Sequence, residues 1–192
     1  TGFAALVAQP DALRDTIARR CARRGWDAWI EPLTRWAKDF LVTDFALPST
    51  AKQGATSFRL ATLAEAIPEM EFWIAASDVD ATELDRVVRA HTLDAAERPA
   101  LAPAMLNGML KGFIDLVFEH GGRYYVLDWK SNHLGYAPSD YGPAGLQAAM
   151  AEHSYHLQYL LYALAVDRYL RHRVPGYRHD THFGGVLYLF VR

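Results

Sequence analysis

The spacing of apolar residues predicts helices at both ends of a strand-rich centre. From Asp11 to Phe40, apolar side chains such as Leu13 and Cys21 recur at helical spacing. Pro32 is expected to start or kink the second part of this helical region. Further helices are expected at Ala81–Ala90 and, as one long element that ends before Pro175, at Gly145–Arg173.

Short runs rich in β-branched and aromatic residues predict strands between these helices and after the last of them. Met70–Ala75 fits one strand, and Gly185–Val191 fits a last, buried strand. Gly112–Glu119 and Arg123–Trp129 flank a Gly-Gly pair, which supplies the positive φ angles of a tight hairpin turn. Polar or Gly- and Pro-containing connectors are expected at Ser49–Ser57, Leu93–Met105 and Ser131–Pro143.

A two-residue turn in this hairpin sets Asp115 directly opposite Asp128, with Cβ atoms roughly 5 Å apart. Lys130 lies two residues further and shares their face. Because like charges at that distance repel, either one carboxylate has a raised pKa or a divalent cation such as Mg²⁺ joins the two. The alternative is a pair of strand-end aspartates that face solvent, and a one-residue slip or bulge would turn one of them over.

A second group of polar residues lies within the predicted long helix. Tyr155, Gln158 and Tyr162 follow i, i+3, i+7 spacing and share one helical face. The glutamine could hydrogen-bond a metal-bound water or a phosphate, and the tyrosines could stack or donate to phosphate. The alternative is a tyrosine-rich core stripe with a satisfied glutamine.

The composition fits one domain with a helical extension. The 192 residues are 51% apolar, and the longest apolar run falls well short of a membrane span. The single cysteine, Cys21, excludes an intrachain disulfide framework and favours a reducing compartment. A net charge of −2 gives no broad footprint of a nucleic-acid binder, and the arginine cluster at residues 14–24 is most simply a solvated helix face. The start at Thr1, without methionine, suggests a piece of a longer polypeptide.

Three stretches together resemble the RecB-type nuclease domain of bacterial exodeoxyribonuclease V. They are GMLKGFIDLVFEHGGRYYVLDWKSNHLG (Gly108–Gly135), SYHLQYLLYALAVDRYLRHR (Ser154–Arg173) and HFGGVLYLFVR (His182–Arg192). The likeness is strong from Met105 to Arg192 and weaker but traceable through EMEFWIA (Glu69–Ala75).

The resemblance implies an α/β fold with a PD-(D/E)xK restriction-endonuclease-like core, in which helices flank a mixed central sheet. Residues 1–60 would form the N-terminal helical part of the nuclease domain, and residues 61–192 the nuclease core. The implied reaction is Mg²⁺-dependent hydrolysis of phosphodiester bonds. Asp115 and Asp128 match the metal-binding carboxylates, with the carbonyl of Trp129 also facing the metal, and Lys130 matches the catalytic lysine.

The resemblance also assigns residues outside the hairpin. Gln158 and Tyr162 match the family's Q-x-x-x-Y motif, and Glu69 best fits its upstream glutamate, with Glu71 as a rival. The family further uses a metal-binding histidine on an N-terminal helix, whereas the first histidine here is His91. Either that histidine precedes the chain or this member has replaced it.

The implied context is a bacterial, cytoplasmic helicase–nuclease without membrane contact. Its substrate would be single-stranded DNA or unwound duplex, its partners RecC- and RecD-like subunits, and its further contact a RecA-like recombinase. Two other interpretations stay open: a docking module that has lost its metal site, and a stand-alone nuclease of the same fold. The retained Asp115, Asp128 and Lys130 argue against the docking module.

Overall fold

The computed structural model describes residues 2–48, 56–91 and 100–191. The chain divides into two compact units, one of residues 1–66 and 118–122 and one of residues 67–117 and 123–192. All residues expected to carry chemistry belong to the second unit. The functional division into residues 1–60 and 61–192 stays a prediction.

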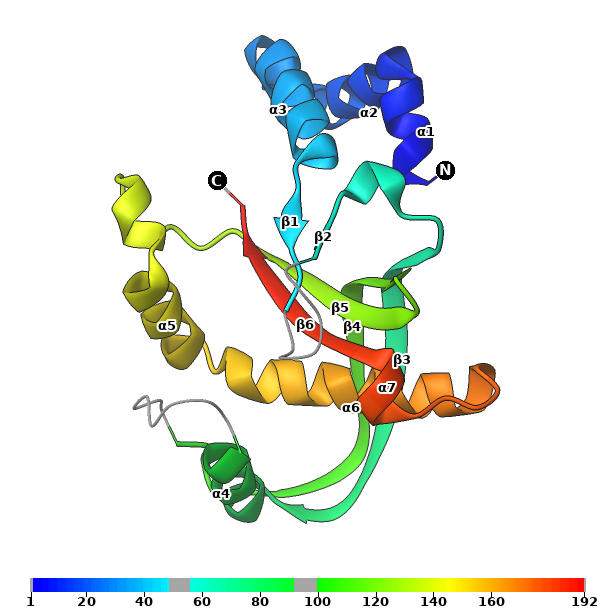
Figure 1. Cartoon of the computed structure of the whole chain (residues 1–192). Coiled ribbons are helices and arrows are strands. Elements are labelled where there is room, and N and C mark those ends of the chain that lie inside the picture. Colours follow the sequence, from blue (N-terminus) through cyan, green and yellow to red (C-terminus); the bar gives the residue numbers. More distant parts are fainter. Residues whose placement is uncertain (1, 49–55, 92–99, 192) are drawn as a thin grey trace. The chain divides into compact units, whose positions relative to one another are not determined.

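Helices form the start of the first unit, coloured blue in Figure 1. The predicted helical region is confirmed, but a short 3-10 turn, η1, interrupts it, and Pro32 lies in the first turn of α3, where a missing N–H costs no hydrogen bond. Two short antiparallel strands follow. The elements are α1 (Phe3–Ala8), α2 (Pro10–Ala22), η1 (Asp27–Trp29), α3 (Ile30–Val42), β1 (Phe45–Ala46), β2 (Ser57–Phe58) and η2 (Leu60–Thr62).

A series of aromatic rings runs through the first unit. Trp36 stacks on Phe40, Phe40 meets Phe45 edge-on, and Phe45 contacts Phe58, with centroid distances of 5.2, 5.2 and 5.6 Å. Phe58 in turn stacks on Phe118 at 4.6 Å. Because aromatic pairs stabilise beyond their buried area, this series ties α3 to the β1–β2 pair and to the end of the central hairpin.

The second unit is built on a sheet in the order β3-β4-β5-β6. β5 and β6 run parallel. The hairpin of β4 and β5 turns at Gly121 and Gly122, whose φ angles of 61° and 79° confirm the predicted glycine turn. The sheet is therefore mixed, and with its flanking helices it confirms the predicted α/β architecture. The strands are β3 (Ala66–Asp80), β4 (Met105–His120), β5 (Arg123–Lys130) and β6 (Phe183–Phe190).

Two strands are longer than predicted, and the last one is less buried. β3 extends beyond both ends of Met70–Ala75, and β4 starts seven residues before Gly112. The prediction of a buried final strand is wrong in its burial, since every residue of β6 is only half-buried. The reason is its position: among the described residues β6 is an edge strand of the sheet.

The helices of the second unit differ from prediction at one point. α4 (Ala81–His91) is confirmed, but the single helix at Gly145–Arg173 is wrong, because α5 (Pro143–Glu152) and α6 (Tyr155–Arg173) are separate. Ser154 between them takes a left-handed conformation with φ of 53°, and this conformation ends a helix. The sequence has no proline or glycine at this position that would have predicted the break. The remaining helical elements are η3 (Pro138–Tyr141), inside an otherwise irregular predicted loop, and α7 (His179–His182).

α6 supplies the cover for one face of the sheet (Figure 1). Its Tyr162, Val166 and Leu170 join one buried cluster with Phe72 of β3 and Val126 of β5. This packing places the polar residues of α6 close to the centre of the sheet.

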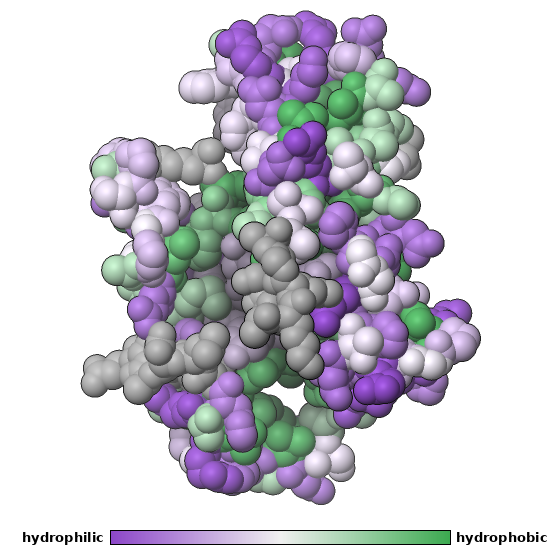
Figure 2. All heavy atoms as spheres, in the orientation of Figure 1, coloured by the Kyte–Doolittle hydropathy of each residue, from purple (hydrophilic) through white to green (hydrophobic). Residues whose placement is uncertain are grey.

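Apolar side chains also reach the surface along β4. Figure 2 shows hydrophobic residues exposed near the ends of β3 and β4 beside α4. The exposed residues of β4 include Met105, Leu106, Met109 and Leu110. The predicted connectors at Ser49–Ser57 and Leu93–Met105 fall largely outside the described residues.

Candidate active site

The hairpin brings the two predicted aspartates close enough for their charges to interact. Oδ2 of Asp115 accepts a hydrogen bond from the backbone N–H of Trp129 at 2.8 Å. The carboxylate of Asp115 therefore contacts β5 through the Trp129 N–H. The direct opposition of Asp115 and Asp128 stays a prediction.

The carboxyl group of Asp128 is buried, and its pKa is shifted. The residue is 4% exposed, and burial raises the pKa of its carboxyl. The ammonium of Lys130, 2.6 Å from Oδ2, opposes that rise, and the charge of Asp115 adds to it. The repulsion predicted between the two aspartates is thus present, and an ion pair with the lysine offsets part of it.

The Lys130 ammonium is held from several sides. The residue is 8% exposed, and its Nζ donates to Oε1 of Gln158 at 2.8 Å. The same nitrogen lies 3.8 Å from the ring centroid of Tyr155 and 4.9 Å from that of Tyr188. Aromatic faces stabilise a desolvated cation. A carboxylate, an amide oxygen and two rings therefore fix the position of one charged atom.

Gln158 connects this lysine to two tyrosines. Its Nε2 donates to the hydroxyl of Tyr162 at 2.8 Å, and its Oε1 accepts from Tyr188 at 3.1 Å. Burial, followed by the charge of Asp128, raises the pKa of Tyr162 to about 12, so its hydroxyl keeps its proton at neutral pH. The i, i+4 spacing on α6 thus builds a hydrogen-bond network in which the glutamine is satisfied, which also agrees with the alternative of a tyrosine-rich core stripe.

Tyr188 is a member of this network that the sequence did not predict. β6 runs parallel to β5 with Tyr188 beside Asp128, and its hydroxyl also donates to the carbonyl of Tyr155 at 3.2 Å. The two tyrosine rings stack at 5.5 Å. No spacing rule predicts this pairing, because it depends on the register of a strand that follows α6.

The loop after Lys130 is tied to the same group. Oδ1 of Asn132 accepts a hydrogen bond from the Tyr155 hydroxyl at 3.0 Å. The backbone N–H of Leu134 donates to the Tyr141 hydroxyl at 3.2 Å. The first bond holds the start of the loop against α6, which carries Gln158, and the second ties the loop to η3.

The two candidate glutamates lie apart from this cluster. Glu71 accepts from the indole of Trp73 at 2.6 Å and pairs with Lys111 at 3.1 Å, and these hydrogen bonds hold the pKa of Glu71 below its usual value. Glu69 is exposed and takes a φ of 50°. In the described parts of the chain no three acidic, histidine or cysteine side chains gather as metal ligands, so neither glutamate joins the aspartates here. The catalytic assignment of Glu69 stays a prediction.

The aspartates themselves suit a divalent cation. Oδ2 of Asp128 is buried and lies 2.6 Å from the Lys130 ammonium, so this carboxylate is charged and already faces one cation. Asp115 contributes a second, half-buried carboxylate beside it. Hard cations such as Mg²⁺ prefer carboxylate oxygens and tolerate one or two of them with water completing the shell. The residues present therefore fit a metal, with the carbonyl of Trp129 as a further predicted ligand.

Sequence comparison now decides the family, since residues 7–192 match the PD-(D/E)XK nuclease superfamily. The chain belongs to this superfamily. It is 52% identical over 125 residues to the RecBCD enzyme subunit RecB of Escherichia coli (strain K12), a match that covers 65% of this chain and 11% of that protein. It is 36% identical over 169 residues to the RecB subunit of Haemophilus influenzae (strain ATCC 51907 / DSM 11121 / KW20 / Rd), which covers 86% and 13%.

A third relative extends the likeness beyond these species. The RecBCD enzyme subunit RecB of Mycobacterium tuberculosis (strain H37Rv) is 50% identical over 88 residues, 45% of this chain and 8% of that protein. The chain thus spans only about a tenth of the length of these relatives. Members of the PD-(D/E)XK superfamily generally use divalent metal ions, in agreement with the paired aspartates. In the described residues no helix is long and apolar enough to cross a membrane.

Proposed function

We propose that this PD-(D/E)XK domain hydrolyses phosphodiester bonds of DNA with Mg²⁺, as the nuclease part of a RecBCD-type helicase–nuclease of the exodeoxyribonuclease V type. One observation carries the proposal: Asp128 and Lys130, both buried, form an ion pair beside Asp115, and Gln158 fixes the lysine. Burying such a pair is costly, so its retention beside the polar side chains of Asp115 and Gln158 favours a catalytic role.

The aspartates and the lysine have separate tasks in this reaction. Asp115, Asp128 and the carbonyl of Trp129 would hold the metal. When bound, the metal supplies an acidified water and neutralises charge on the scissile phosphate. The Lys130 ammonium orients the attacking water or stabilises charge on the phosphoryl oxygens. In-line attack forms a bond from the water oxygen to phosphorus and breaks the bond to O3′, which leaves a 5′-phosphate and a 3′-hydroxyl.

Gln158 and Tyr162 act as positioning residues. Gln158 holds the lysine through its amide oxygen, and Tyr162 fixes the orientation of that amide through Nε2. Glu69, with Glu71 as its rival, would complete the motif set if the exposed start of β3 moved toward the aspartates. Tyr162 contacts Gln158, Gln158 contacts Lys130, and Lys130 contacts Asp128. Loss of any one of these contacts should therefore displace the Lys130 ammonium.

The biological setting follows from the RecB relatives. The names of these proteins place them in a RecBCD enzyme. For this chain we propose RecC- and RecD-like subunits as partners, single-stranded or unwound duplex DNA as substrate, contact with a RecA-like recombinase, and a role in double-strand-break repair and recombination in the bacterial cytoplasm. A companion helicase would supply most of the DNA affinity, which agrees with a net charge of only −2.

Asp128→Asn in the purified protein tests the proposal. This change keeps the size of the side chain and removes the charge, so both Mg²⁺ binding by calorimetry and Mg²⁺-dependent degradation of linear DNA should fall at least about 100-fold. Asp44→Asn is the control, because Asp44 pairs with Arg59 on the surface of the other unit. If Asp128→Asn degrades DNA like the wild type, Asp128 is no metal ligand. A wild-type protein that binds neither Mg²⁺ nor Mn²⁺ would be a docking module instead.

A further inference from the structure

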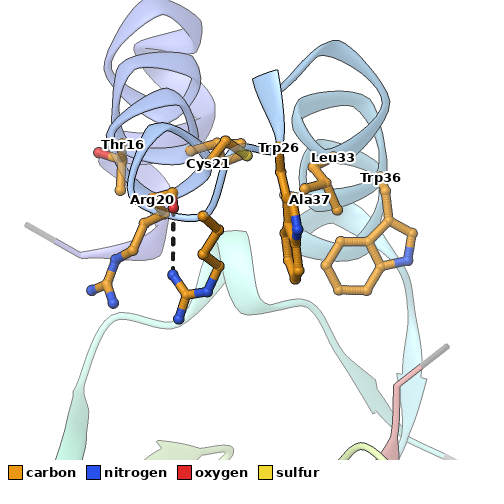
Figure 3. Close-up of a pocket in the computed structure, with 9 residues that line it drawn as sticks. Thr16, Arg20, Cys21, Trp26, Leu33, Trp36 and Ala37 are labelled. Atoms are coloured by element: carbon orange, nitrogen blue, oxygen red, sulfur yellow. Dashed lines mark hydrogen bonds between the residues drawn. The ribbon is translucent and has the colours of Figure 1, made fainter. Parts of the chain in front are cut away.

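A groove between α2 and α3 in the first unit is lined by residues that have no part in the proposed nuclease reaction. Its volume is about 210 Å³, and Ile17, Leu33 and Ala37 form its apolar floor. Trp26 and Trp36 rise on the side of α3, and Arg20 rises on the side of α2 (Figure 3). Planar aromatic rings thus face a guanidinium group across an open gap.

The two tryptophans of the groove are unusually exposed. Trp26 is 52% and Trp36 43% exposed, although tryptophan is largely buried on average. Trp36 stacks on Phe40 with an interplanar angle of 18°, and the guanidinium of Arg24 lies 5.8 Å from the Trp26 ring. Both rings are therefore held in place while one face or edge remains open to a ligand.

The surface inside the groove is almost wholly apolar, and two of its lining residues, Arg20 and Arg24, bring positive charge to it. Of the arginines on and just after α2, Arg14 pairs with Glu31, but within the described ranges neither Arg20 nor Arg24 has a carboxylate partner. Arg24 donates only to the backbone oxygen of Arg20, at 3.4 Å (Figure 3). Two arginines without acidic partners beside two open indole rings favour an anionic ligand with flat, apolar parts.

We propose that this groove binds single-stranded DNA, with bases stacked on Trp26 and Trp36 and phosphates held by Arg20 and Arg24. Aromatic stacking with a positive groove is the general mode of strand binding without sequence preference. Guanidinium groups suit it because they pair with phosphate and also stack on flat rings. The inference rests on the proposed function only in taking DNA as the ligand, since all residues of the groove lie outside the unit that carries Asp128.

Tryptophan fluorescence tests the proposal directly. The purified protein is titrated with oligothymidine in EDTA, which prevents cleavage, and stacking should quench the emission. Trp26→Ala should weaken binding about tenfold, in the range expected for one stacked base. Trp29→Ala is the matched control, because Trp29 is 59% exposed on η1 but does not line the groove. It should bind like the wild type.

A second variant covers the case in which Trp26→Ala fails to fold. Arg20 is exposed, so Arg20→Ala leaves the apolar packing intact. It should make the slope of log affinity against log salt shallower by about 0.7, the contribution of one phosphate contact on a single strand. An unchanged slope overturns the role of Arg20.

Two results would overturn the groove as a DNA site. One is binding without quenching, or equal weakening by Trp26→Ala and Trp29→Ala. The other is quenching by an acidic helical peptide but not by oligothymidine, which would make the groove a protein-docking site. Degradation of DNA with Mg²⁺ is measured in parallel. If the protein degrades DNA while Trp26→Ala binds normally, only the groove inference fails, and if it degrades no DNA, the proposed function fails.

Discussion

Gln158 is the side chain that holds Lys130, the proposed catalytic lysine, and Gln158→Met isolates its contribution. Methionine has a similar length and volume but offers no comparable hydrogen bond. The variant loses one bond to the charged Lys130 and one each to Tyr162 and Tyr188. A bond to a charged group contributes about 1.5–3 kcal/mol and a neutral one about 1 kcal/mol, so the free energy of unfolding should fall by about 4 kcal/mol.

Activity should fall more steeply than substrate binding in this variant. Gln158 reaches the reaction through Lys130, so its loss lets the ammonium move without removing a metal ligand. We expect kcat to fall about 100-fold, since misplacement of a catalytic group by about 1 Å costs that much. KM and Mg²⁺ affinity should change little.

Urea unfolding at neutral pH, with DNA degradation measured on the same preparations, checks both expectations. Gln9→Met is the control, because Gln9 is exposed and caps α2 without a side-chain hydrogen bond, and it should change stability by no more than about 0.5 kcal/mol. If Gln158→Met unfolds within about 1 kcal/mol of the wild type, or if KM rises while kcat is kept, Gln158 does not hold the lysine as described.

Three further changes test other parts of the structure. Lys130→Met should abolish cleavage yet bind Mg²⁺ about tenfold more tightly by calorimetry, because the Lys130 ammonium at Asp128 would repel a second cation held by the same carboxylate; weaker binding would contradict it. Burial raises the pKa of Asp167, but hydrogen bonds from Arg171 and a histidine outweigh it and lower that pKa, so the stability is present above the unfolded pKa and is lost as pH falls. Asp167→Asn should thus lower the unfolding free energy by about 0.5–1 kcal/mol at pH 6, and its difference from the wild type should shrink as pH falls below the usual range of a carboxyl pKa, as guanidinium titrations across this pH range would show. Gly122→Ala should destabilise by about 1–2 kcal/mol in urea, because a φ of 79° strains any residue with a Cβ, and an unchanged midpoint would exclude the glycine turn.

The parts of the active site that lie near one another in sequence were predictable. The Gly-Gly turn gave the hairpin, and the hairpin brought Asp115 close to Asp128 with Lys130 nearby. Helical spacing put Gln158 and Tyr162 on one face. These relations depend on backbone periodicity over a few residues, so they could be predicted without knowledge of the tertiary packing.

The sequence by itself determined the α/β character of the chain, the hairpin and the polar face of α6, because periodicity and turn chemistry are local properties. Only the tertiary structure decided which elements meet. The placement of Tyr188 beside Asp128 depends on the register of a parallel strand that follows an intervening helix, and the break at Ser154 carries no proline or glycine. The side-by-side arginines and tryptophans of the groove between α2 and α3 likewise come from helix packing, which single-residue spacing cannot encode. Long-range contacts of this kind are fixed by the sum of many weak packing interactions.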